Sequence, residues 1–233
     1  FSTFYQRAYD QIAQDICINK CPVTILIRNG SVWAGNDVTH LGWFDMALFS
    51  NIPNMVFLCP TNCEEYFAML DWSIEQKEHP VIIRVPRGKV IHTDTVVDSD
   101  YSNLNKFLLT QKGTKVAILA LGDFYQIGEN LAVLLEERLG FVPTLINPRY
   151  ASGLDTEMLA ELEKEHQIVV TIEDSILDGG FGQKVASSYG ATNIKVLNYG
   201  LKKEFLDGYN ASEVLKEYGI EPEMMVNRII ELL

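Results

Sequence analysis

Short apolar runs alternate with amphipathic segments along the first part of the chain. The runs at 22–28, 54–59 and 80–86 are rich in β-branched residues, which predicts buried strands. Residues 3–19 and 62–78 carry apolar side chains at helical spacing, so each predicts a helix that buries one face. This order of elements is typical of parallel sheets covered by helices.

The alternation stops between residues 92 and 114, where the sequence is polar and irregular, and then resumes. After it we expect strands at 115–121, 142–146, 168–173 and 194–198, and helices at 124–139, 155–165, 181–189, 211–218 and 222–233. The pattern predicts the α/β class, with two three-layer α/β domains built on mostly parallel sheets. We place these domains at 1–91 and 113–233, joined by a linker at 92–112.

Composition narrows the range of partners. The chain has 233 residues, of which 47% are hydrophobic, enough for a sizeable core. Its 19 basic and 31 acidic residues give a net charge of −12, which argues against nucleic acid as a partner. No apolar run is long enough to span a membrane, and the first residues do not resemble a signal peptide. We therefore expect a cytoplasmic protein with no membrane partner.

The four cysteines form two pairs of equal spacing, Cys17/Cys21 and Cys59/Cys63. Two such pairs could supply a four-thiolate zinc site. The pairs lie at predicted element boundaries and lack the turn glycines of a zinc knuckle. Reduced free thiols are the favoured interpretation, and no metal ligand is assigned.

The loop GNDVTHLGWFD at 35–45 contains the strongest candidate for chemistry. It follows the strand that ends at Arg28, and ligands bind at the carboxyl ends of strands in open α/β sheets. His40 could donate to a substrate oxygen or move a proton near neutral pH. Asn36 and Asp37 share this polar loop, although Asp37 could instead cap the next helix.

Arginines and aromatic residues provide further candidates. Arg84 and Arg87 bracket the end of the strand at 80–86, where they could bind a phosphate or carboxylate, or form ordinary surface ion pairs. Phe1 and Phe4 could stack on a flat heterocycle, or serve as a hydrophobic staple and a core residue. The stretch EDSILDGGFG lacks the full GxGxxG spacing, so we interpret it as a turn with close helix–strand packing.

Several motifs together resemble the 1-deoxy-D-xylulose-5-phosphate synthase family of transketolase-like thiamine diphosphate enzymes. They are FSTFYQRAYDQ, DVTHLGWFD, SNIPNMVFLCPTNCEEY, HPVIIRVPRGK, EDSILDGGFG and VLNYGL. The similarity runs essentially from residue 1 to the C-terminus. It implies that 1–91 resembles the later part of a pyrimidine-binding domain and 113–233 a transketolase C-terminal domain.

The family's reaction condenses pyruvate with glyceraldehyde 3-phosphate and releases carbon dioxide, with thiamine diphosphate and Mg²⁺ as cofactors. By this resemblance Phe4 would pack against the aminopyrimidine ring, His40 would face the substrate, and Arg87 would hold the phosphate. The expected site residues are therefore catalytic His40, Asp37 and Asn36; cofactor-binding Phe1, Phe4 and Arg7; and substrate-binding Arg28, Arg84 and Arg87.

Some positions depart from the family pattern. The family has a tyrosine where Phe1 stands, so a hydroxyl is missing. Its substrate arginine falls opposite Asn29, with Arg28 one place earlier. The family spacing of aspartate to histidine is met by Asn36, whereas Asp37 is one residue closer, so either could take that role.

Some residues and motifs of the family are missing from this chain. The segment RYASGLD at 149–155 lacks the lysine and proline of the family motif. In the family, the activating glutamate and the motif for Mg²⁺ and the diphosphate lie upstream of the matched region. The chain begins without Met inside a segment with a helical pattern, so we expect it to be part of something longer.

We therefore expect this chain to be inactive alone and to need a missing N-terminal half or subunit, within a homodimer. Two other interpretations remain open. One is a C-terminal subunit of a split transketolase, or the beta subunit of a 2-oxo-acid dehydrogenase, which share the domain plan. The other is a dimerisation or regulatory module without catalysis.

Overall fold

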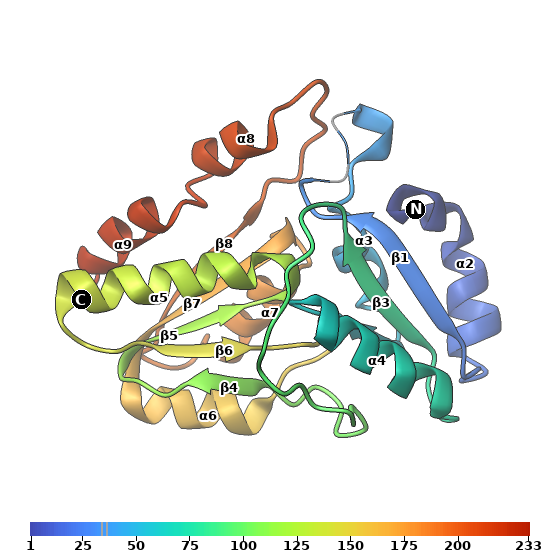
Figure 1. The fold of residues 1–233 in the computed structure, drawn as a ribbon, viewed down its shortest axis with the longest axis horizontal. Coiled ribbons are helices and arrows are strands. Elements are labelled where there is room, and N and C mark those ends of the chain that lie inside the picture. Colours follow the sequence, from blue (N-terminus) through green and yellow to red (C-terminus); the bar gives the residue numbers. More distant parts are fainter. Residues whose placement is uncertain (34, 36) are drawn as a thin grey trace.

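Two sheets organise the chain in the computed structural model, which describes residues 1–33, 35 and 37–233 (Figure 1). The strands are β1 Thr24–Gly30, β2 Val56–Leu58, β3 Val81–Pro86, β4 Leu108–Gln111, β5 Lys115–Ala120, β6 Thr144–Asn147, β7 His166–Ile176 and β8 Lys195–Leu201. The first sheet has the parallel order β1-β3-β2. The second has the order β4-β6-β5-β7-β8, in which β4 alone of these strands runs antiparallel. The predicted α/β class with mostly parallel sheets is confirmed.

Helices cover both faces of the first sheet because its strands bury alternate side chains on opposite sides. Phe57 and Ile82 pack with Ile12 of the N-terminal helical segment and with Phe49 of α3, Asp45–Phe49. The neighbouring strand residues pack instead against Met69 of α4, Cys63–Glu75. This side of the molecule is therefore three-layered, as predicted.

The N-terminal segment is helical where a helix was predicted, but its winding is irregular. It contains α1 Ser2–Tyr5, the 3-10 turn η1 Gln6–Ala8, α2 Tyr9–Gln11 and the π-helical η2 Ile12–Cys17. Only part of its apolar stripe packs into the core, since Ile12 is buried whereas the Phe4 side chain is 59% exposed. Phe4 is thus available for contacts outside the core.

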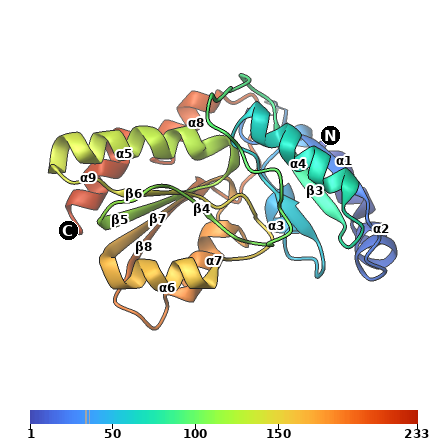
Figure 2. The ribbon, with the colours of Figure 1, turned by 60° about the horizontal axis from the view of Figure 1, so that its bottom comes forward.

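The second sheet has the same layered design (Figure 2). Even-numbered residues of β5 pack with the helices at 125–139 and 222–230, and odd-numbered ones pack with the helices at 156–165 and 181–188. The remaining helical elements are η3 Val38–His40, η4 Gly122–Phe124, α5 Tyr125–Leu139, α6 Thr156–Glu165, α7 Phe181–Ser188, α8 Ala211–Glu217 and α9 Pro222–Ile230. Helices at 211–218 and 222–233 were predicted, and α8 and α9 occupy those stretches.

The last part of the segment predicted as a linker, 92–112, contains a strand in the structure. Residues 108–111 form β4, which pairs with the neighbouring β6 as an edge strand of the second sheet. The strand is short and mostly exposed, so its sequence does not show the apolar run by which the other strands were predicted.

A buried ion cluster joins the two sheets. Arg84, at the end of β3, is 2% exposed. Its Nε lies 2.9 Å from Asp45 Oδ2, and its Nη1 lies 2.5 Å from Asp174 Oδ1 on β7. Nη2 donates to the carbonyl of Gly42 at 2.9 Å. A Cβ at Gly30 would lie 2.7 Å from Arg84 Nε, so glycine leaves room for the guanidinium.

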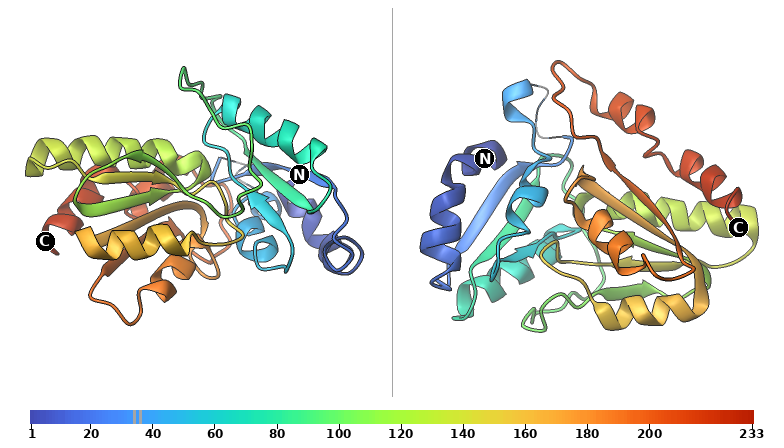
Figure 3. Two further views of the ribbon diagram at one scale, coloured as in Figure 1. Left: turned by 90° about the horizontal axis from the view of Figure 1, so that it is seen from below. Right: turned by 180° about the vertical axis from the view of Figure 1, so that it is seen from behind.

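Further contacts cross the same junction, which is seen from two more sides in Figure 3. The Trp43 carbonyl accepts from Ile176 N at 3.1 Å. Ser31 Oγ donates to Asp123 Oδ2 at 2.9 Å. Burial, reinforced by the nearby charge of Asp174, raises the pKa of Asp123 to about 6. The first and second domains are therefore joined by polar and charged contacts as well as apolar packing.

We predict that Arg84→Met destabilises the protein by roughly 3–5 kcal/mol, because it leaves two buried carboxylates without their cation. The free energy of unfolding in urea measures this change. Lys89→Met removes an exposed cation and provides the control, with a change below about 0.5 kcal/mol. Equal stability of the two variants would contradict the assigned role of Arg84.

We also predict a pH dependence from Asp123. Its pKa is higher in the folded state than in the unfolded chain, so its stabilising contribution is complete below pH 4 and is lost as pH rises through about 6. Asp123→Asn keeps an acceptor for Ser31 and removes the titration. The slope of unfolding free energy against pH between 4 and 7 should therefore be flatter in this variant, and an unchanged slope would contradict the assignment.

Candidate functional site

The histidine loop is built around a short capped turn. Asp37 Oδ1 accepts from Thr39 N at 2.8 Å and from Thr39 Oγ1 at 2.7 Å, so Asp37 caps η3. These hydrogen bonds lower the pKa of Asp37. His40 Nδ1 lies 2.8 Å from Thr39 Oγ1 and 3.8 Å from Asp37 Oδ2. Asn36, the other candidate for the aspartate role, lies outside the described residues.

The hydrogen bonds select one form of the neutral imidazole. A carboxylate can only accept, so the Thr39 hydroxyl donates to Asp37 and its oxygen is left to accept from His40. Nδ1 of His40 therefore carries the hydrogen, and Nε2 carries the lone pair. This arrangement resembles that of a general base whose second nitrogen is oriented by a polar neighbour.

The C-terminal domain holds this loop in place. Asp207 Oδ1 accepts from Val38 N at 3.1 Å, and the single Tyr209 hydroxyl hydrogen lies between the carbonyl oxygens of Val32, at 2.6 Å from the hydroxyl, and of Gly35. The position of His40 thus depends on both domains.

Phe1 and Phe4, both at the start of the N-terminal helical segment, lie against His40 of η3. The ring centroids of Phe1 and His40 are 5.1 Å apart in an edge-on arrangement, and those of Phe4 and His40 are 5.7 Å apart. The two phenylalanine rings are 5.3 Å apart. The structure therefore brings together three residues predicted for catalysis and cofactor binding. We name Phe1, Phe4 and His40 the aromatic cluster.

The predicted basic residues fall into two groups. Arg28 and Arg87 are exposed and lie at the same edge of the first sheet, because β1 and β3 are adjacent and parallel. Arg7 is also exposed, on η1. Arg84 differs, since its guanidinium is buried and engaged by Asp45 and Asp174. Its position indicates a structural role at the domain junction in place of the predicted contact with substrate.

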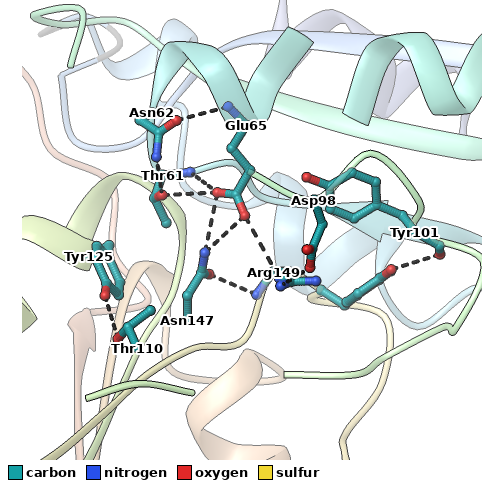
Figure 4. A network of polar contacts seen from close by, with 10 residues as sticks. Thr61, Asn62, Glu65, Asp98, Tyr101, Thr110, Tyr125, Asn147 and Arg149 are labelled. Atoms are coloured by element: carbon teal, nitrogen blue, oxygen red, sulfur yellow. Dashed lines mark hydrogen bonds and ion pairs between the residues drawn. The ribbon is translucent and has the colours of Figure 1, made fainter. Parts of the chain in front are cut away.

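A second polar group lies where α4, β4 and α5 meet (Figure 4). Asn147 Nδ2 donates to Glu65 Oε1 at 3.0 Å, and Arg149 lies within 3.9 Å of the same carboxylate. Arg149 also pairs with Asp98 at 2.6 Å. Burial raises the pKa of Glu65, and these residues line a cavity of about 710 Å³. Sequence reasoning missed this group because its members come from distant segments without a local motif.

The turn in EDSILDGGFG packs closely, as predicted. Glu173 accepts from the N–H groups of Phe181 and Gly182 at 2.9 and 2.7 Å, which places a carboxylate at the start of α7. A Cβ at Gly182 would lie 2.4 Å from Thr171 Oγ1. Sequence reasoning did not anticipate that Glu173 and Asp174 of β7 are buried, although charges inside a buried run are themselves a signal.

Family models match most of the chain. The model for the transketolase pyrimidine-binding domain matches residues 1–92, and that for the transketolase C-terminal domain matches residues 105–225. The chain belongs to the transketolase-like thiamine diphosphate enzyme family. The cofactor of this family, thiamine diphosphate, carries a flat aminopyrimidine ring.

Among relatives, the chain is 34% identical to a 1-deoxy-D-xylulose-5-phosphate synthase of Clostridium tetani and 33% identical to one of Thermomicrobium roseum. Each alignment covers 100% of this chain but only 37% of the relative's length. A solved structure described as a split gene transketolase, inactive beta4 tetramer, is similar with a TM-score of 0.84 and 25% identity, over 100% of this chain and 74% of that one. A Pichia stipitis transketolase shares the fold at a TM-score of 0.77 and 18% identity, over 100% and 33%.

The residues present fit one part of the family's cofactor. Phe1 and Phe4 offer accessible rings for a pyrimidine. Within the described part of the chain, the group that could hold a metal consists of Cys63, Glu64 and His92, whose thiol and imidazole do not suit Mg²⁺. None of the described helices is long and apolar enough to cross a membrane.

We predict that Phe4→Ala changes the unfolding free energy by less than about 0.5 kcal/mol, because most of its ring is exposed. Phe57→Ala is the matched core substitution, and it should cost about 3–5 kcal/mol since Phe57 is 0% exposed. Chemical denaturation of both variants tests this difference. A loss at Phe4 as large as that at Phe57 would mean that Phe4 is a core residue.

Proposed function

We propose that this chain forms the pyrimidine- and substrate-facing half of a thiamine diphosphate enzyme that condenses pyruvate with glyceraldehyde 3-phosphate and releases carbon dioxide. The reaction is that of 1-deoxy-D-xylulose-5-phosphate synthase, which feeds isoprenoid, thiamine and pyridoxal synthesis. The observation that carries the proposal is the contact of His40 with both Phe1 and Phe4 at the accessible end of the first domain. The identity of 34% to a synthase over the whole chain supports this reaction over others of the family.

When bound, thiamine diphosphate supplies carbanion stabilisation at the reacting carbon. Phe1 and Phe4 would pack against its aminopyrimidine ring, with Arg7 beside them. His40 would exchange a proton with substrate oxygens through Nε2, while Thr39 and Asp37 hold the ring. This assigns Asp37 a positioning role through hydrogen bonds at 2.7 and 2.8 Å.

Arg28 and Arg87 would bind the anionic groups of the substrates. Both are exposed at the carboxyl ends of neighbouring parallel strands, where ligands bind in open α/β sheets. Guanidinium groups suit both carboxylates and phosphates, and Arg87 would take the phosphate of glyceraldehyde 3-phosphate. We leave Arg84 out of the substrate site because Asp45 and Asp174 already bind its guanidinium.

The proposal requires a second contributor to the site. The activating glutamate and the groups for Mg²⁺ and the diphosphate would come from sequence that precedes this chain or from a separate subunit, so we expect the 233 residues alone to be inactive. We expect a cytoplasmic homodimer of the assembled enzyme. The chain spans about 37% of the length of its synthase relatives, which is consistent with this division.

A split transketolase is the second candidate. The observation that favours it is the TM-score of 0.84 to a split gene transketolase over 100% of this chain. The two candidates differ in substrate. The complete enzyme would release carbon dioxide from pyruvate in the first case, and would transfer a two-carbon unit from a ketose phosphate such as xylulose 5-phosphate in the second.

We predict that His40→Ala, in the complete enzyme, lowers kcat by about 10²–10⁴-fold because it removes the proton-transferring group. Steady-state assays with pyruvate, glyceraldehyde 3-phosphate, thiamine diphosphate and Mg²⁺ measure the change. His79→Ala is the matched control, since His79 pairs with Glu78 away from the aromatic cluster, and it should keep normal turnover. Full turnover of a folded His40→Ala enzyme would reject the proposed role.

A further inference from the structure

A thiol, a carboxylate and an imidazole meet at the start of α4, apart from the aromatic cluster. One ligand atom from each of Cys63, Glu64 and His92 lies within 4.8 Å of the other two. His92 is 68% exposed and Glu64 is 36% exposed, so solvent and ions can reach the group. Cys63 is a half-buried free thiol. The proposed function gives no role to any of the three.

Backbone contacts hold these side chains together. Cys63 N donates to the carbonyl of Ile91 at 2.9 Å, which ties the start of α4 to the segment after β3. Thr93 N donates to Glu64 Oε2 at 2.9 Å across the same contact. The ligand atoms therefore belong to two segments that are already joined, which reduces the conformational entropy lost when an ion binds.

The short distance between the imidazole and the carboxylate also suits a metal site. His92 Nδ1 lies 2.8 Å from Glu64 Oε1. The Glu64 carboxylate thus accepts from the Thr93 backbone N–H at 2.9 Å through Oε2, while Oε1 faces His92. On binding a divalent ion the Cys63 thiol would release its proton, and the resulting thiolate and the Glu64 carboxylate would balance the charge of the ion beside the positive end of the α4 dipole.

We propose that Cys63, Glu64 and His92 bind a divalent ion of the Zn²⁺ type, with water as the fourth ligand. Sulfur, nitrogen and oxygen in one tetrahedral set are the ligands that Zn²⁺ takes in proteins, whereas Mg²⁺ takes oxygen. This site is distinct from the four-cysteine arrangement that the pair spacing suggested, because it recruits one cysteine together with residues of other types. It is also distinct from the Mg²⁺ site of the family.

Such an ion would act as a clip between α4 and the segment after β3. His92, Thr93 and Thr95 line the cavity of about 710 Å³ at the meeting point of the domains. Binding of the ion would fix this wall of the cavity. Because the ion binds the folded chain, it would raise the melting temperature.

Cobalt and zinc together test the proposal on the purified chain. Co²⁺ should produce the ultraviolet absorption band of a thiolate-to-cobalt charge transfer, and Zn²⁺ should displace it and raise the melting temperature. In Cys63→Ser the band should vanish, and Zn²⁺ affinity in Cys63→Ser and in His92→Ala should fall at least about tenfold. Mg²⁺ should give no thermal shift.

Cys21→Ser is the matched control, because Cys21 is another half-buried free thiol. It should keep the cobalt band, the zinc affinity and the thermal shift. Absence of the band in the parent chain would overturn the proposal, as would Zn²⁺ affinity that is unaffected by Cys63→Ser or is lost with Cys21→Ser. Circular dichroism of each variant confirms that it is folded, and none of these measurements requires the enzyme reaction.

Discussion

The buried pairing of Arg84 with Asp45 and Asp174 is the contact on which the rest of the structure depends. Buried charges are tolerated only when paired and hydrogen-bonded, and these three side chains are each no more than 2% exposed. Two carboxylates from different domains share one guanidinium, so separation of the domains would leave a charge without its partner. Arg84 also binds the carbonyl of Gly42, two residues after His40. The junction thereby anchors one end of the loop that contains the candidate site.

The candidate site is accessible to solvent, in contrast to the buried ion cluster. Phe4 is 59% exposed beside His40, and exposed aromatic surface next to an ordered polar turn is typical of a place where something binds. Contacts from Asp207 and Tyr209 give this accessible cluster a fixed support in the C-terminal domain. The two joined domains thus present an accessible cluster, which the cofactor and the second contributor would cover in the proposed enzyme.

The sequence predicted the features that have a local cause. Buried strands appear as β-branched runs, and His40 was selected because its loop follows a parallel strand. Strand β4 was missed because it is short and most of its residues are exposed. Arg84 was assigned to the substrate because the local sequence does not show that its side chain is buried. Its burial depends on Asp45 and Asp174, which lie 39 and 90 residues away. Such partners have no signature in local spacing. The grouping of Phe1 and Phe4 with His40 likewise required the fold.

The most direct test is hydrogen–deuterium exchange at the C2 position of each histidine ring, measured by mass spectrometry. The chain is compared alone and after assembly with the polypeptide that supplies the diphosphate-binding half, thiamine diphosphate and Mg²⁺. Exchange at His40 should slow on assembly, because the cofactor and substrate site would close over it, while exchange at His79 should stay unchanged. Equal exchange at His40 in both states, in an assembly that is shown to form, would contradict the claim that this cluster faces the reaction.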